Sequence, residues 1–177
     1  MPKKSRFATK KTIMNKFSYI APKSLAEARK QVTATAPQIA TGKTIQGAAV
    51  IKAGGVDLLD LMKTNIIQPD KIVSINSIPN LDKITFDANR GLKIGALVKL
   101  SAVEHDPDIK KHYRALHESV SHAATPQIRN MATMGGNLAQ RPRCWYFRSE
   151  EHRCLKKGGD TCFAKNGQNQ IHGIFDT

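Results

Sequence analysis

Apolar positions along the chain follow two spacings, which together predict short strands between helices. Short runs with apolar residues predict strands at 15–20, 48–52 and 71–75, and the strand at 48–52 is expected to be buried. Between the first two runs, apolar side chains recur at the spacing of a helix with one buried face. Ser24 and Glu27 have the spacing of a capping box, so this helix is predicted to cover 24–36, with Pro37 outside it. A second helix is predicted over 57–65.

The next segment alternates apolar and polar residues and predicts a β-hairpin. Its two strands are expected at 83–87 and 91–96. Helices are then expected over 99–104 and 107–124. In the longer helix the inward-facing side chains are expected to be Tyr113, Leu116 and Val120. Short strands between helices indicate an α+β or mixed α/β fold.

The pattern changes after residue 141, where aliphatic residues become rare and charged residues frequent. All three cysteines of the chain lie in this part. The sequence therefore predicts three regions, which are a basic tail over 1–14, a folded domain over 15–141 and a long cysteine-containing loop over 142–177. The tail is expected to be disordered, or to precede a natural start at Met14. We expect this loop to be ordered by something other than a hydrophobic core.

The charge of the chain is strongly positive, with 28 lysines and arginines against 14 aspartates and glutamates, a formal +14. Such a charge suits nucleic-acid binding, but the basic residues are spread along the chain and aromatic residues make up only 6%. This spread favours a solvated basic surface, which would face an acidic partner subunit, over nucleic-acid binding. No apolar run approaches the roughly 18 residues of a membrane-spanning helix. The basic first 13 residues also lack the apolar core of a secretory signal.

A first candidate ligand site follows the predicted strand at 48–52. Two glycines come directly after the strand and directly before a helix, where bare backbone N–H groups can approach a phosphate group. On its own, a glycine pair before a helix is also typical of an ordinary turn. The candidate residues are Ile51, Lys52, Ala53, Gly54, Gly55, Val56, Asp57, Leu58 and Leu59.

A second glycine pair lies further along the chain, flanked by side chains that can donate hydrogen bonds. Arg129 precedes it and brings a guanidinium near the same turn, unless that group is simply solvated. Two such loops in one small domain favour a dinucleotide ligand over the separate turns that either would indicate by itself. The candidate residues of this loop are Thr133, Gly135, Gly136 and Asn137.

The three cysteines form the third candidate site. Cys144, Cys154 and Cys162 contain no Cys-x-x-Cys pair, which argues against a zinc finger. Three thiols are one fewer than an iron–sulfur cluster usually takes, and an odd number for a disulfide framework. Lysines and arginines nearby would stabilise thiolates or an anionic cluster. The pattern leaves a metal cluster and three unrelated thiols equally open.

Taken together, these motifs resemble the FAD-binding subunits of molybdenum hydroxylases, the xanthine dehydrogenase type. Those subunits have a PCMH-type domain of the vanillyl-alcohol-oxidase flavoprotein superfamily. The resemblance lies in AGGVDLL (53–59), ATMGGNL (132–138), PQIRN (126–130) and GLKIGALVKLSAVEHDPDI (91–109). It implies the N-terminal part of such a domain, with both glycine loops around the FAD pyrophosphate and no covalent link. Val56 stands where the family usually has Thr, which removes one hydroxyl donor to phosphate.

The segments QRPRCWYFR, HRCLKKGGDTC and IHGIF resemble a narrower subset, typified by periplasmic aldehyde oxidoreductases and 4-hydroxybenzoyl-CoA reductases. Flavin subunits of that subset also hold a 4Fe-4S cluster. The resemblance implies Cys144, Cys154 and Cys162 as three cluster ligands. The fourth ligand is then expected beyond Thr177, because the family's subunits are longer and this chain is expected to be truncated.

The implied role is electron transfer inside an oxidoreductase complex. A large subunit with a molybdenum cofactor would oxidise an aldehyde or an aromatic heterocycle, and a small 2Fe-2S subunit would pass electrons to FAD and on to an external acceptor. No residue of this chain is expected to act as a catalytic acid, base or nucleophile. Neither nucleic acid nor membrane is an expected partner, and the location is expected to be cytoplasmic, or periplasmic by co-export with a partner.

Two alternatives from other classes stay open. The chain is either a non-functional remnant that keeps only a partner-binding surface, or a basic nucleic-acid-binding module. The presence of bound flavin would distinguish the FAD-binding interpretation from both of these alternatives.

Overall fold

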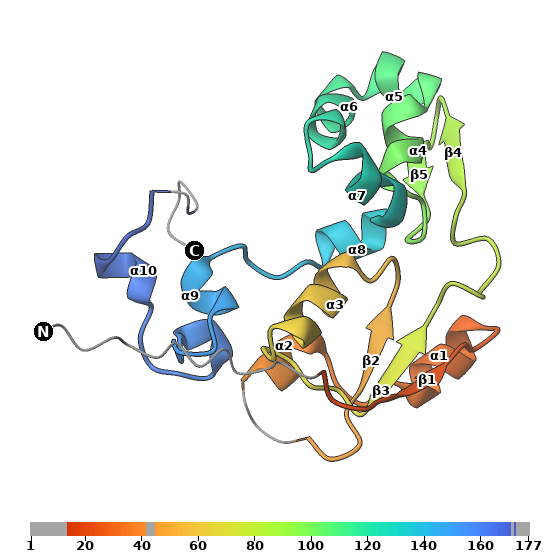
Figure 1. The fold of residues 1–177 in the computed structure, drawn as a ribbon. Coiled ribbons are helices and arrows are strands. Elements are labelled where there is room, and N and C mark those ends of the chain that lie inside the picture. Colours follow the sequence, from red (N-terminus) through yellow and green to blue (C-terminus); the bar gives the residue numbers. More distant parts are fainter. Residues whose placement is uncertain (1–13, 42–44, 171, 173–177) are drawn as a thin grey trace, which may run out of the picture.

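The protein is described by a computed structural model covering residues 14–41, 45–170 and 172 (Figure 1). Nearly all of the tail expected over 1–14, and the IHGIF segment apart from His172, lie outside these residues. The mixture of helices and strands confirms the predicted α+β class. The helices are α1 (Leu25–Gln31), α2 (Ala36–Ala40), α3 (Val56–Lys63), α4 (Leu100–His105), α5 (Pro107–His112), α6 (Arg114–Ser121), α7 (Pro126–Met131), α8 (Met134–Leu138), α9 (Trp145–Arg148) and α10 (Phe163–Asn166), with a 3-10 turn, η1, at Leu155–Lys157.

A small parallel sheet forms the centre of the first lobe. Its strands are β1 (Ser18–Ile20), β2 (Ala49–Lys52) and β3 (Lys71–Ser74), in the order β1-β3-β2. Each strand lies within the apolar run that predicted it. Because β3 is central and parallel to both neighbours, the chain crosses over a helix between successive strands, as parallel strands require.

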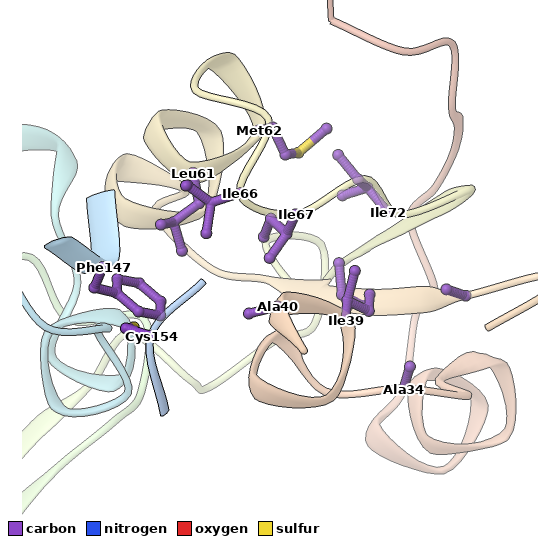
Figure 2. Close-up of a cluster of buried hydrophobic side chains, with 12 residues drawn as sticks. Ala34, Ile39, Ala40, Leu61, Met62, Ile66, Ile67, Ile72, Phe147 and Cys154 are labelled. Carbon is purple, nitrogen blue, oxygen red and sulfur yellow. The ribbon is translucent and has the colours of Figure 1, made fainter. Parts of the chain in front are cut away.

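The two faces of this sheet are covered by different helices. Val50 and Ile72, opposite each other in the register, pack with Leu61 of α3 in one apolar cluster. Val73 faces the other way and packs with Ala28 of α1. Side chains alternate between the faces of a strand, so one short sheet supports two layers of helix. Figure 2 shows the cluster on the α3 side.

The helix predicted over 24–36 is wrong in its second half. Ser24 does cap α1, accepting from the Glu27 N–H at 3.1 Å, but α1 ends at Gln31. The β-branched residues that follow favour extended backbone, and Thr33 and Ala34 donate their N–H groups to the Ala49 carbonyl. A new helix, α2, then begins after Thr35, so Pro37 lies in its first turn rather than outside a helix.

A second lobe contains the hairpin β4 (Ile84–Asp87) and β5 (Gly91–Ile94), packed with α4 to α7. Figure 1 shows this lobe beyond the end of α3 that bears the glycine loop. Instead of one helix over 107–124 there are two, because the backbone of Tyr113 leaves the helical conformation between α5 and α6. Tyr113, Leu116 and Val120 do face the apolar cluster of this lobe, as predicted.

The segment after residue 141 is not independent of the hydrophobic core, which corrects the sequence-based expectation. Phe147 of α9 is 1% exposed and Cys154 is 7% exposed, and both belong to the cluster around Leu61 and Ile66 (Figure 2). Beyond them, Tyr146 stacks on Phe163 with ring centroids 5.9 Å apart. Phe147 and Cys154 make contacts with the core that were not expected, because the segment has few aliphatic residues.

Candidate functional site

A single pocket of about 760 Å³ lies where the two glycine loops meet. The first loop, at 53–59, joins β2 to α3 and continues into that helix. The second, at 132–138, was expected to be a loop, but only its first two residues connect α7 to α8, and Gly135, Gly136 and Asn137 lie in α8. Every ligand-binding residue predicted from the sequence lines this pocket except Leu59. Leu59 packs against the apolar cluster beneath α3 instead. The pocket therefore brings together two loops that are far apart in the sequence.

The first loop leaves the start of α3 open to the pocket. Gly55 is the N-cap of α3 and has the left-handed conformation, with φ of 84°, which a glycine adopts without strain. No side chain caps this helix. Its first N–H groups and the positive end of its dipole are therefore available to an anion.

Gly54 is required by contact between the loops rather than by space for a ligand. A Cβ added at Gly54 would lie 2.4 Å from the Met131 carbonyl oxygen and 3.2 Å from the Thr133 nitrogen. Both atoms are backbone and cannot move aside cheaply. A glycine at this position lets the two loops touch.

Thr133 connects the two loops through its hydroxyl oxygen. That oxygen accepts from the Gly54 N–H at 3.4 Å and from the Gly136 N–H at 3.3 Å. The side chain is 1% exposed. Thr133 thus sets the spacing of the two backbones, and its lone pairs are used within the protein.

The second loop contributes two glycines with different surroundings. A Cβ on Gly135 would lie 2.9 Å from the Cβ of Ala96, in the turn between β5 and α4. A Cβ on Gly136 would meet only the Thr133 hydroxyl, at 3.1 Å, among the atoms of the described residues. Gly136 is therefore the glycine that leaves open space on the pocket side.

Asp57 acts as an anchor for the segment that follows the second loop. Its carboxylate accepts from the Arg141 N–H at 2.8 Å and from Arg148 at 2.6 Å, and it pairs with Arg143 at 3.3 Å. Arg148 also pairs with Asp60 at 2.8 Å. The first turn of α3 is in this way tied to the start of the cysteine-containing segment.

The structure adds pocket residues that the sequence-based prediction missed. Arg141 and Arg143 line the pocket from the segment after α8. Their position just after the second glycine loop was the available signal. Two further walls, one formed by Val32 and 34–37 and the other by Ala123 and Ala124, also line it, and no motif marks either of them.

Arg129, expected to point its guanidinium at the ligand or at solvent, does neither. It is 8% exposed and forms a bidentate ion pair with Glu104 of α4. Its Nε and Nη2 donate to the two carboxylate oxygens at 2.8 and 3.1 Å. It also donates to the carbonyls of Ala123 and Ala124 at 3.1 and 2.8 Å. Arg129 therefore holds one wall of the pocket in place.

The three cysteines occupy different environments. Cys154 is buried, Cys144 is half-buried and Cys162 is exposed. Among the residues that the structure describes, no three Cys, His, Asp or Glu side chains gather closely enough to hold a metal ion. As they lie, the thiols do not form a cluster site. Burial lowers the pKa of the nearby Lys157 ammonium, against the opposing pull of Cys154 and Cys144.

Comparison with known proteins agrees with this geometry. Residues 15–147 match the family described as the FAD binding domain in molybdopterin dehydrogenase. The aldehyde oxidoreductase FAD-binding subunit PaoB of Escherichia coli (strain K12) is 36% identical over 145 residues, which cover 81% of this chain and 45% of that protein. The nicotinate dehydrogenase FAD-subunit of Eubacterium barkeri is 34% identical over 71% of this chain and 39% of its own length.

Solved structures give the same result. The carbon monoxide dehydrogenase of Hydrogenophaga pseudoflava superposes with a TM-score of 0.58 and 31% identity, over 71% of this chain and 40% of the solved one. The chain thus spans less than half the length of these relatives. Within the described residues, no helix is both long and apolar enough to cross a membrane.

Proposed function

Because the chain belongs to the family of FAD-binding domains in molybdopterin dehydrogenases, we propose that its pocket binds FAD without a covalent bond. The diphosphate would lie between the first loop, at Gly54 to Asp57, and the second, at Gly135 to Asn137. The observation that carries this proposal is the single pocket that both loops line.

The residues present fit such a ligand. The start of α3, which no side chain caps, offers N–H groups to a phosphate. Gly136 leaves room for the ligand to approach the backbone of the protein. Val56, at the position where the resemblance led us to expect a threonine, would contribute its N–H but no hydroxyl. The volume of the pocket lies within the usual range for ligand sites.

The wider role that we propose is that of an electron-transferring oxidoreductase subunit. FAD supplies the redox chemistry when it is bound, and the residues of this chain bind and orient it. We propose a large molybdenum-cofactor subunit and a small 2Fe-2S subunit as partners, because relatives are named as FAD-binding subunits or medium chains of dehydrogenases. Aldehydes or aromatic heterocycles would be the substrates of the complex, as the names of these relatives suggest.

We also propose that 15–141 form the FAD-binding unit and 142–177 an extension docked onto it. Phe147 and Arg148 make the contacts that support this division. The extension would carry a 4Fe-4S cluster as a second, finer candidate. Its support is the resemblance of the segments around Cys144, Cys154 and Cys162 to flavin subunits that hold such a cluster, and cluster binding would require the three thiols to come together.

The flavin proposal is tested by reconstitution. The purified chain is incubated with FAD, passed through a desalting column and denatured, and the released flavin is identified by chromatography. We expect close to one FAD per chain. A chain that retains no flavin, alone and in an assembled complex, would refute the proposal.

The cluster proposal needs a separate assay. Iron and acid-labile sulfide are measured after anaerobic reconstitution of the wild-type chain and of a Cys154→Ser variant. We expect iron and sulfide in the first and their loss in the second. Equal metal content in both chains would show that the thiols hold no cluster.

A further inference from the structure

We propose that Arg141 supplies the positive charge that binds the phosphate groups of the ligand in the pocket. This inference rests on the proposed FAD-binding function and adds a specific residue to it. Arg141 stands outside both glycine loops, so the loop motifs do not identify it.

The backbone of Arg141 is fixed on both sides. Its N–H donates to the Asp57 carboxylate at 2.8 Å, and its carbonyl accepts from the Arg148 guanidinium at 3.1 Å. Asp57 lies in the first turn of α3, directly after the first glycine loop. Arg141 is therefore held at a set place beside the part of the pocket where a phosphate would lie.

The side chain of Arg141 lacks the partners that neighbouring arginines have. Its guanidinium lies over the Phe147 ring, 5.2 Å from the centroid, and its Nε is buried without a hydrogen-bond partner among the described residues. No ion pair involves Arg141 in the described part of the chain, whereas Arg143 and Arg148 both pair with Asp57. A buried donor without an acceptor is costly, so an acceptor supplied by a ligand would stabilise this arrangement.

The charge balance of the pocket points to an anionic ligand. Its charged lining residues are Lys52, Asp57, Arg141 and Arg143, which are three cations and one carboxylate. The carboxylate of Asp57 is already bound by Arg148 at 2.6 Å. The pocket therefore keeps a positive excess next to the open start of α3. A guanidinium presents a planar pair of donors that matches two phosphate oxygens.

The test compares two ligands that share a diphosphate. FAD and ADP are titrated by calorimetry into the whole chain, into Arg141→Gln and into Arg141→Lys, with thermal unfolding recorded for each. We expect Arg141→Gln to weaken both ligands by roughly 10- to 100-fold, the size of a hydrogen bond to a charged group. Arg141→Lys keeps the charge but not the planar donor pair, so its affinities should fall between those of the other two chains.

The matched control is Arg114→Gln on α6. It removes the same charge from a side chain that is 85% exposed and does not line the pocket. It should leave both affinities within twofold of wild type, which would show that overall charge is not the cause.

The other outcomes separate the inference from the function on which it rests. Wild-type affinity of Arg141→Gln for FAD would overturn the role of Arg141 and leave FAD binding intact. Weakening of FAD alone, with ADP unchanged, would place Arg141 at the isoalloxazine end and also overturn it. Should the glutamine variant unfold, Arg141→Met decides in its place, because it removes the charge and keeps an apolar contact with the Phe147 ring. Wild-type affinity of that variant for both ligands would overturn the role of Arg141. Binding of neither ligand by the wild-type chain would refute the proposed function itself.

Discussion

Gly54 and Gly136 belong to two similar sequence motifs, but Gly54 precedes the N-cap of α3 and Gly136 lies in the first turn of α8, and their surroundings give them different roles. The first lets the loops touch, since a Cβ there would overlap the Met131 carbonyl. The second leaves space on the pocket side. From the sequence alone both were expected to face the phosphates, because a repeated motif does not reveal which glycine is needed for packing.

Substitutions at these two glycines should therefore fail in different ways. Gly136→Leu should abolish FAD retention, because its side chain would enter the pocket, and should cost less stability than Gly54→Ala, because its Cβ would contact the Thr133 hydroxyl, at 3.1 Å, and no backbone atom of another segment. Gly54→Ala should lower the free energy of unfolding by about 1–3 kcal/mol, as overpacking does. FAD content and urea unfolding of both variants check this. A Gly136→Leu chain that retains FAD would contradict the placement of the ligand.

Thr133 gives a second prediction at the scale of one residue. Thr133→Val keeps the side chain's shape but removes the oxygen that accepts from Gly54 and Gly136. The two half-buried N–H groups would lose a partner, and we expect the free energy of unfolding, measured in urea, to fall by about 1–2 kcal/mol. Thr133→Ser keeps the oxygen and should lose less. Equal stability of the valine variant and wild type would show that these long hydrogen bonds contribute nothing.

At the scale of elements, the ion pair of Arg129 and Glu104 joins α7 to α4 and holds the Ala123–Ala124 wall of the pocket. Ala124 has a φ of 55°, a conformation that is strained for alanine. Two hydrogen bonds from Arg129 to this turn help to hold it.

Replacing Arg129 alone should therefore lower the free energy of unfolding more than replacing both Arg129 and Glu104. Arg129→Met leaves Glu104 without its partner and should lower the unfolding free energy by about 3 kcal/mol. The double variant Arg129→Met/Glu104→Met should recover part of that loss in thermal unfolding. A single variant as stable as wild type would indicate that the pair has no structural role.

The elements predicted from the sequence were reliable where the apolar pattern was local. All five strands and the helix after Gly55 were found within a few residues. The expectations failed where a helical pattern continued through a break, at 32–35 and at Tyr113. At 32–35 the backbone bonds to the Ala49 carbonyl, a partner far along the chain that the periodicity of a short segment does not contain. At Tyr113 the ring packs edge-on against Phe86 of β4, again a partner outside the segment.

At the scale of the whole molecule, the cysteine-containing segment and the pocket are parts of one packed unit. Phe147 enters the core beneath α3, and Arg148 binds Asp57 and Asp60 from the same short helix. The sequence identified both regions by motif, but their attachment depends on one aromatic side chain and one guanidinium in a polar segment.

Removing that aromatic side chain should detach the segment. Phe147→Ala should lower the unfolding free energy by about 3–5 kcal/mol, the cost of emptying a buried aromatic site. Cleavage by trypsin between 141 and 166 should become faster. Phe163→Ala, at a side chain that is more exposed, is the control and should cost less. Unchanged stability and cleavage in Phe147→Ala would mean that the segment is held by other contacts.

The central claim is that the two glycine loops together bind the diphosphate of FAD. Its most direct test is an NMR titration of the ¹⁵N-labelled chain with FAD and with ADP, following assigned backbone amides. We predict that Gly55, Val56, Gly136 and Asn137 shift most with both ligands, while the amides of β4 and β5 stay in place. Binding that leaves these four amides unmoved, or shifts only one of the two loops, would contradict the claim.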